Sequence, residues 1–366
     1  MGRAYNFSAG PATLPLEVLQ QVQADLVDYK GTGMSVMEMS HRGKDYDQIH
    51  NEAIANFKEL CGIGDDYEVL FVQGGASLQF SMIPMNFLGA GQTADYAKEG
   101  TWSGKALKEA KIVAALRGAN ANTICDCAKD IPTRMPRDDE WKFSENPVYT
   151  HICTNETISG AQLKKIPEVK GVLIADMSSD ILSRRVDVSK YAMIYGGAQK
   201  NAGPAGVAFY IIKKDLLGKV SRYIPTMLDL RTHIDKLSMF NTPPVFSIFV
   251  MNETLKWLKS IGGIDAIHAI DEKKAATLYA EIDRNSLFTG TAEKEDRSIM
   301  NVCFVMAPGH EDLQDEFFAF AKSKGMVGIK GHRSVGGFRA SLYNACTQED
   351  VEALVATMKE FEALKK

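Results

Sequence analysis

The chain has 366 residues, of which 45% are hydrophobic and 24% are charged, and its formal net charge is −4 at pH 7. This composition is typical of a globular protein with two domains, or with one large domain and a smaller appendage. No basic run is long enough for a nucleic-acid groove, and the longest uncharged stretch, residues 69–94, is interrupted by glycines and a proline. We therefore expect neither nucleic-acid binding nor a membrane span.

The N-terminal residues and the cysteines both favour a cytoplasmic protein. Residues 1–6 lack the apolar core of a signal peptide. The six cysteines form no CxxC pair, so we expect buried or incidental thiols in a reducing compartment.

In chain order, apolar residues first recur at helical spacing from Leu16 to Leu26, after Pro15, and from Ile49 to Leu60, before Gly62. Strand-like runs follow at residues 68–72, 111–115, 148–153, 171–175, 192–195 and 207–212. Helical or irregular segments separate most of these runs, which predicts a mostly parallel sheet covered on both faces. The prediction is a large α/β domain over residues 16–255.

The pattern then changes to a small α+β domain over residues 256–366. We expect helices at 262–284 and about 312–323, strands at 298–306 and 337–343, and a last helix that opens at Thr347 with a capping box. Residues 1–15 are expected to pack near this small domain and the active site. A ligand would bind in the cleft between the two domains.

A single lysine, Lys200, stands on a glycine-rich turn, residues 196–206, between two apolar runs. A lysine that forms an imine with a carbonyl cofactor needs a fixed backbone and a desolvated amine. The alternative is a tight turn that carries a solvated lysine.

Asp176 ends the apolar run 171–175, at the sheet edge where open α/β sheets bind ligands. Alone, Asp176 could equally cap a following helix. Together, Lys200 and Asp176 are the pair that pyridoxal phosphate requires, one for the imine and one to keep the pyridine nitrogen protonated.

Other motifs fit the same cofactor. The turn at residues 73–77 between a strand and a helix suits a phosphate group, although such turns are common. Trp102, between two glycines, could lie against a pyridine ring or belong to the core, and Thr157 could bond the cofactor or stabilise a turn. Basic residues beside glycines, in His41-Arg42-Gly43 and in residues 331–339, suggest an anionic substrate, although any single arginine is more often solvated.

Taken together, these residues resemble the phosphoserine aminotransferases, class V aminotransferases of fold type I. The resemblance runs nearly end to end and rests on the following segments: residues 6–12, His41-Arg42, residues 74–77, Trp102, Asn155-Glu156-Thr157, Asp176, residues 197–200, residues 241–244, and His332-Arg333 with residues 337–341.

The resemblance implies the role of each residue. Lys200 would form the imine with pyridoxal phosphate and shuttle a proton, and Asp176 would hold the pyridinium. The other implied cofactor contacts are Trp102 on the ring, Thr157 at the hydroxyl side, and Ala76, Ser77 and Gln199 at the phosphate. Asn241 and Thr242 would reach the cofactor of the neighbouring subunit in a homodimer. His41, Arg42, His332, Arg333 and Arg339 would bind the substrate, and no metal is implied.

The implied reaction is reversible amino transfer between L-glutamate and 3-phosphohydroxypyruvate, which gives 2-oxoglutarate and O-phospho-L-serine. The family also suggests 3-hydroxy-2-oxo-4-phosphooxybutanoate, a keto acid of pyridoxine biosynthesis, as a second substrate. Some relatives have an arginine where this chain has Ser77, so the other basic residues would have to supply more of the contact with the substrate phosphate.

Three alternatives remain at this point. A cysteine desulfurase needs a reactive cysteine on a flexible loop, whereas Cys303 lies in an expected strand and Cys346 precedes an expected helix. A glyoxylate-type class V aminotransferase would not need so many arginines. A binding protein without catalysis would not need Lys200, Asp176 and Trp102 together.

Overall fold

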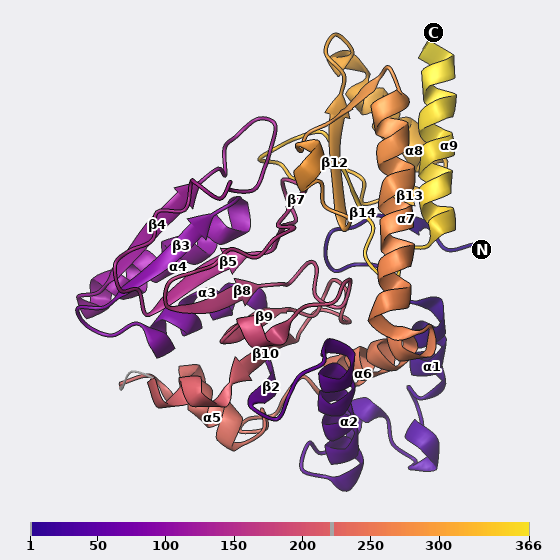
Figure 1. Cartoon of the computed structure of the whole chain (residues 1–366). Helices are drawn as coiled ribbons and strands as arrows, with labels where there is room; N and C mark the ends of the chain where they lie inside the picture. Colours follow the sequence, from indigo (N-terminus) through magenta and orange to yellow (C-terminus); the bar gives the residue numbers. More distant parts are fainter. Residues whose placement is uncertain (1, 220–222, 366) are drawn as a thin grey trace.

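The computed structural model describes residues 2–219 and 223–365. A seven-stranded sheet is the centre of the larger unit (Figure 1), with the strand order β2-β10-β9-β8-β5-β3-β4. The strands are β2 (Tyr67–Val72), β3 (Thr93–Lys98), β4 (Asn120–Asp126), β5 (Tyr149–Cys153), β8 (Val172–Asp176), β9 (Met193–Gly197) and β10 (Ala208–Lys213). Strand β10 runs antiparallel to the other six strands, which share one direction. The predicted mostly parallel α/β sheet is confirmed.

Helices cover both faces of this sheet, which explains why the central strands β5, β8 and β9 are buried along nearly their whole length. One face packs against α2 (Lys44–Cys61), α6 (Val245–Ser260) and the start of α7 (Gly263–Arg284). The other face packs against α3 (Gly75–Phe87), α4 (Thr101–Arg117) and α5 (Leu230–Asp235). Helix α1 (Leu16–Ala24) lies against α6. The described residues also contain seven short 3-10 helices: η1 (Tyr29–Gly31), η2 (Val36–Glu38), η3 (Val188–Lys190), η4 (Lys214–Lys219), η5 (Thr226–Leu228), η6 (Lys294–Asp296) and η7 (Glu311–Leu313).

One predicted strand was wrong, because residues 111–115 belong to helix α4. Val113 and Ala114 are buried, whereas Ile112 and Leu116 are 47% and 79% exposed. This alternation is that of a helix with apolar residues on its solvent-facing side as well as on its buried side. The sequence prediction also missed β3 and β4, which flank this helix and form the edge of the sheet.

The smaller unit has an antiparallel sheet of β11 (Phe288–Gly290), β12 (Asn301–Met306) and β14 (Phe338–Ser341). Helices α7, α8 (Gln314–Ser323) and α9 (Gln348–Lys365) pack against it (Figure 1). The expected capping box is confirmed at α9. The backbone N–H of Asp350 donates to Thr347 Oγ1 at 3.1 Å, and that of Thr347 donates to Asp350 Oδ2 at 3.0 Å.

The N-terminal segment joins the smaller unit to the turn that carries Lys200. Strand β1 (Tyr5–Asn6) pairs with β13 (Met326–Val327), and the backbone N–H of Ala12 donates to the carbonyl of Gln199 at 2.9 Å. A further short pair, β6 (Asn155–Glu156) and β7 (Ala161–Gln162), lies between the two units. The domain division at residue 255 stays a prediction, and that residue lies inside α6.

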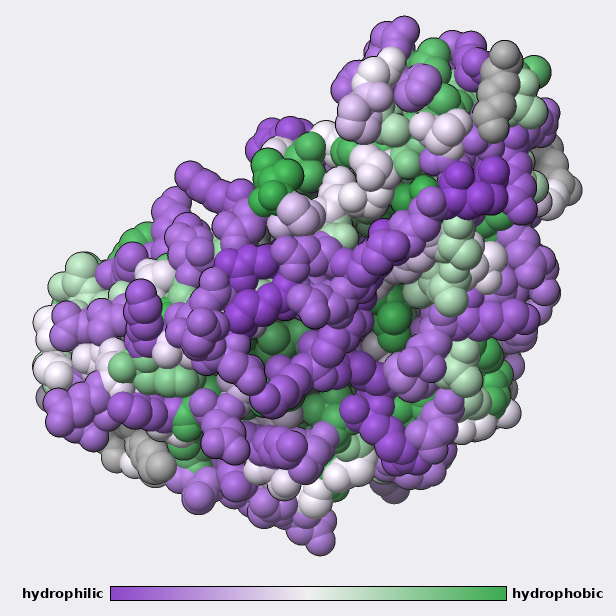
Figure 2. Space-filling model, turned by 45° about the horizontal axis from the view of Figure 1, so that its top comes forward, coloured by the Kyte–Doolittle hydropathy of each residue, from purple (hydrophilic) through white to green (hydrophobic). Residues whose placement is uncertain are grey.

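Hydrophilic residues cover most of the face drawn in Figure 2, and hydrophobic residues appear there as separate patches. Among the helices of residues 2–219 and 223–365, none is both long and apolar enough to cross a membrane.

Candidate active site

A cavity of about 210 Å³ opens at the carboxyl ends of β5, β8 and β9. It brings together seven residues that the sequence analysis assigned to the cofactor: Ala76, Ser77, Trp102, Thr157, Asp176, Gln199 and Lys200. Parallel strands end at the same edge of a sheet, so side chains that are distant in sequence meet there.

Lys200 lies in the tight turn between β9 and β10. The turn is closed by a hydrogen bond from the Gly203 N–H to the Ala198 carbonyl at 2.8 Å, and a Cβ on Gly203 would lie 2.9 Å from Met251 Cα. The Lys200 side chain is 8% exposed, and its Nζ donates to Thr157 Oγ1 at 2.8 Å. Burial lowers the pKa of Lys200, and the carboxylate of Asp176 opposes that shift. The amine is therefore held in place and easily made nucleophilic.

Asp176 is the last residue of β8 and is 4% exposed. Its Oδ1 accepts hydrogen bonds from the N–H and the hydroxyl of Ser178, at 2.9 and 2.6 Å, which fixes the carboxylate. Burial raises the pKa of Asp176, while Ser178 and Lys200 act against that shift. No regular helix follows Asp176, so the helix-cap interpretation does not apply.

The predicted phosphate turn leads directly into helix α3. Gly74 has a φ of 89°, and a Cβ there would lie 2.5 Å from the Cβ of Leu78. Gly75, Ala76 and Ser77 form the first turn of α3 and line the cavity. The free N–H groups of a helix N-terminus favour an anion at this position.

Trp102 stands on the first turn of α4 and lines the cavity, with its ring centroid 5.8 Å from Lys200 Nζ. Its Nε1 is buried and finds no partner within the described chain, and the same holds for Nε of Arg339.

Arg339, one of the basic residues assigned to the substrate, contacts the wall of the cavity. Its Nη1 donates to the carbonyl of Thr157 at 3.3 Å. The pKa of His332 is lowered by burial and by the positive charges of Arg339, Lys105 and Arg333. These basic side chains therefore share one region beside the cavity mouth.

Like His332, Arg333 and Arg339, the remaining predicted contacts do not line this cavity: His41, Arg42, Asn241 and Thr242. His41 and Arg42 precede α2, while Asn241 and Thr242 precede α6. His41 Nε2 and Asn241 Oδ1 are buried without a hydrogen-bond partner among residues 2–219 and 223–365.

The sequence analysis assigned no role to several lining residues: Gly75, Cys153, Asn155, Ser178, Ser179, Gly197, Gly206 and Val207. Asn155 was signalled by its place beside Thr157, and Cys153 by its position at the end of an apolar run. Ser178 and Ser179 gave no signal beyond following Asp176.

The donor set of the cavity fits pyridoxal phosphate. A buried amine can form the imine, a buried carboxylate can hold a protonated ring nitrogen, and a helix N-terminus can bind a phosphate. The unpartnered Nε1 of Trp102 lies in the same wall.

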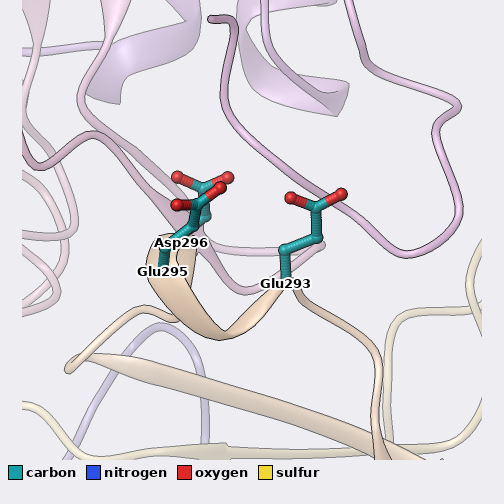
Figure 3. A group of neighbouring side chains, drawn as sticks. All are labelled: Glu293, Glu295 and Asp296. Atoms are coloured by element: carbon teal, nitrogen blue, oxygen red, sulfur yellow. The ribbon is translucent and has the colours of Figure 1, made fainter.

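A group of three carboxylates lies away from this cavity, on and beside η6 (Figure 3). The side chain of Arg137 binds all three: Glu293, Glu295 at 2.7 Å and Asp296 at 2.9 Å. An arginine therefore takes the place that a cation would need.

The thiols do not support sulfur chemistry. Cys303 is in β12, Cys346 is buried, and burial raises the pKa of both to about 12. A desulfurase needs an accessible thiolate, which neither residue offers.

Comparison with known proteins agrees with this geometry. The class-V aminotransferase family model matches residues 4–354. A phosphoserine aminotransferase from Bacteroides fragilis is 52% identical over 366 residues, with 99% of each chain covered.

Solved structures give the same result. A phosphoserine aminotransferase from Bacillus circulans subsp. alkalophilus is 46% identical with a TM-score of 0.93, and the match covers 100% of this chain and 99% of that one. A phosphoserine aminotransferase from Trichomonas vaginalis, solved with pyridoxal phosphate bound, is 42% identical with a TM-score of 0.94, over 98% and 100% of the two chains.

Fold and site together define a class V aminotransferase that depends on pyridoxal phosphate. Within that class, the chain belongs to the phosphoserine aminotransferase family.

Proposed function

We propose that this chain transfers the amino group of L-glutamate to 3-phosphohydroxypyruvate in serine biosynthesis. The reaction is reversible and gives O-phospho-L-serine and 2-oxoglutarate. The observation that carries the proposal is one buried cavity that holds Lys200 and Asp176 beside Arg339, in a chain 52% identical to a phosphoserine aminotransferase.

Pyridoxal phosphate, when bound, supplies an electron sink for the bond changes at Cα of the amino acid. Lys200 accepts the Cα proton and returns it, because burial lowers the pKa of its amine. Asp176 keeps a proton on the ring nitrogen, and Ser178 fixes the carboxylate for that purpose. Trp102 would cover the ring, and Thr157, whose hydroxyl accepts the hydrogen bond of Lys200, would contact it.

Ala76 and Ser77 at the start of α3, together with Gln199, would hold the phosphate of the cofactor. The first turn of α3 presents backbone N–H groups to the cavity. Gln199 is held from the other side by the N-terminal segment, through Ala12.

The substrate anions bind to His332, Arg333 and Arg339. Like charges that lie together beside a cavity repel each other and are stabilised by an anion. The lowered pKa of His332 reflects this repulsion together with burial. A substrate with both a carboxylate and a phosphate would neutralise the cluster.

His41, Arg42, Asn241 and Thr242 act across a homodimer interface. They do not line the cavity of their own chain, and in a homodimer they would act at the cavity of the second subunit. Large apolar side chains are exposed on α1 and on neighbouring segments, as an interface requires. They are Leu16, Leu19, Met34, Met37, Leu237 and Phe240.

The test is an absorbance spectrum of the purified holoenzyme before and after addition of O-phosphoserine, L-glutamate or L-serine. We expect O-phosphoserine and glutamate each to remove the visible band of the bound cofactor, and serine at the same concentration to leave it. A band that responds to glutamate but not to O-phosphoserine would keep the aminotransferase and reject the phosphorylated substrate. A chain that binds the cofactor but responds to no amino acid would instead support the binding-protein alternative.

A further inference from the structure

Helix α4 presents Trp102 to the cavity, yet the residue at its cap position has no side chain that could accept from the first N–H groups of the helix. The residue at the cap position is Gly100, and Trp102 follows two positions later. The first N–H groups of a helix have no partner inside the helix and need an acceptor from elsewhere. The orientation of Trp102 therefore depends on what supplies that acceptor.

The acceptor is Glu156, from strand β6. Its Oε2 accepts from the backbone N–H of Trp102 at 3.1 Å. Its Oε1 accepts from the N–H of Ser103 at 2.8 Å and from the Ser103 hydroxyl at 2.7 Å. Glu156 is 0% exposed, so these three bonds form away from water, at the helix end where a negative charge is favoured.

The glycine at position 100 fits this contact. A Cβ on Gly100 would lie 2.4 Å from Cδ of Glu156, far inside van der Waals distance. The carboxylate therefore takes the space that a capping side chain at position 100 would fill. The Ser103 hydroxyl also accepts from the Gly100 N–H at 2.9 Å, which directs its proton toward Glu156.

Glu156 also adjoins the other side of the cavity. The next residue, Thr157, receives the hydrogen bond of Lys200, and the carbonyl of Glu156 accepts from Gly160 at 2.9 Å, which closes the short hairpin. Glu156 itself does not line the cavity. One dipeptide thus holds both the helix end that carries Trp102 and the hydroxyl that holds Lys200.

We propose that Glu156 is a positioning residue, which caps helix α4 from outside the helix and so fixes Trp102 against the ring of the cofactor. The inference rests on the proposed role of Trp102 as the residue that covers the ring. Burial raises the pKa of Glu156, and its bonds with Ser103 and Trp102 oppose that shift, so the contact favours the charged form.

The test measures release of the cofactor from the holoenzyme after dilution into a cofactor trap, followed by absorbance and by tryptophan fluorescence. Glu156→Gln puts an amide NH₂ against the donors of α4, so at least one N–H loses its acceptor. We expect release about tenfold faster, the scale of one lost charge-assisted bond. Gly100→Ala displaces the Glu156 carboxylate by steric contact and leaves Glu156 itself unchanged. This variant should also accelerate release of the cofactor, and it keeps the test possible if Glu156→Gln folds poorly.

Glu281→Gln is the matched control. Glu281 is also a buried glutamate, but its carboxylate accepts hydrogen bonds from Arg284 and Asn285, and none of these bonds reaches α4. The control should change the release rate by less than about twofold, the usual spread for an uncoupled site.

A double-mutant cycle with Trp102→Ala separates positioning from general stabilisation. Trp102→Ala alone should accelerate release, and Glu156→Gln should then add less than about twofold. An equal effect of Glu156→Gln with and without Trp102 would overturn the inference but leave the proposed function. Unchanged release in Trp102→Ala would instead remove the proposed role of Trp102, and the inference with it.

Discussion

Lys200 and Asp176 carry opposite charges in one buried cavity, and burial acts on both in the direction of neutrality. The pKa of the amine is lowered and that of the carboxyl group is raised. Each opposes the shift of the other. Proton transfer by Lys200 needs a neutral amine, and burial, which lowers the pKa of Lys200, favours that form.

A second buried acid lies close to Glu156. Glu99 is 2% exposed, its Oε2 has no partner within the described chain, and burial together with the charge of Glu156 raises its pKa to about 8. In the unfolded chain the group would titrate near its ordinary value of 4.5. Between these two values the folded protein holds a proton that the unfolded chain has lost, so stability falls as the pH rises.

Glu99→Gln removes this titration. Relative to the wild type, the variant should gain stability from about pH 5 to about pH 8, by at most about 1.4 kcal/mol for each pH unit. The measurement is the melting temperature of the two holoenzymes at several pH values, in which the difference should widen with pH. A difference that stays constant, or that narrows with pH, would show that Glu99 is ionised in the folded protein.

Among the elements, helix α4 shows why the secondary structure of residues 111–115 could not be predicted from the local sequence. Its run at residues 111–115 contains β-branched and apolar residues, and local pattern alone favoured a strand there. The helix forms because its buried positions, Ala106, Ala110, Val113 and Ala114, meet the sheet across several turns. That surface exists only once β3 and β4 have paired beside it.

The cavity residues were predictable for a different reason. Lys200, Asp176, Trp102 and Thr157 each stand in a short motif with glycines or at a strand end, so their local sequence marked them. Glu156 did not stand out, because its partners lie on α4, more than fifty positions away along the chain. Contacts that depend on the packing of two elements leave no trace in either element alone.

The segment between β4 and β5 is held by an ion-pair cluster that the sequence also did not reveal. Figure 3 shows the carboxylates of Glu293, Glu295 and Asp296. Arg137 binds all three, and Asp296 accepts from the N–H of Met135 at 3.0 Å. Thr133 bonds to Thr291 and Glu293 in the same region. The segment is thereby fixed to the smaller unit.

Arg137→Gln should leave three neighbouring carboxylates without their shared cation. We expect a loss of about 1–2 kcal/mol, because the arginine is partly exposed and the pairs are screened, which corresponds to a few degrees in melting temperature. Lys165→Gln is the control, since its ion pair with Asp138 has side chains 77% and 81% exposed. Equal melting temperatures for the two variants would show that the cluster contributes no more than a surface pair.

On the scale of the whole molecule, buried polar bonds join the two units at the active site. Asn155, in the cavity wall, donates to Asn301 of β12 at 2.8 Å, and Asn301 donates to the Tyr343 hydroxyl at 3.1 Å. That hydroxyl donates to the carbonyl of Ala9 at 2.9 Å. A buried network of this kind is costly unless every member is satisfied, so it favours one relative placement of the units. The larger unit, the smaller unit and the N-terminal segment therefore all help to position the wall of the site.

The proposed homodimer can be tested by mixing two defective chains. Lys200→Ala destroys the site of its own subunit, while Asn241→Ala/Thr242→Ala should impair the site of its neighbour, because the proposal places these two residues at the cofactor of the second subunit. In a mixed dimer, one site then has Lys200 from one chain and intact Asn241 and Thr242 from the other. Half of randomly mixed dimers are hybrids with one intact site of two, so about a quarter of wild-type activity should return.

The measurement is transaminase activity after the two purified variants are unfolded, mixed in equal amounts and refolded with cofactor. Each parent, refolded alone, is the control and should remain poorly active. Recovery in the mixture requires that the contacts cross between subunits, because neither chain can repair its own defect. A mixture no more active than the average of its parents would place Asn241 and Thr242 at the site of their own subunit, or away from any site.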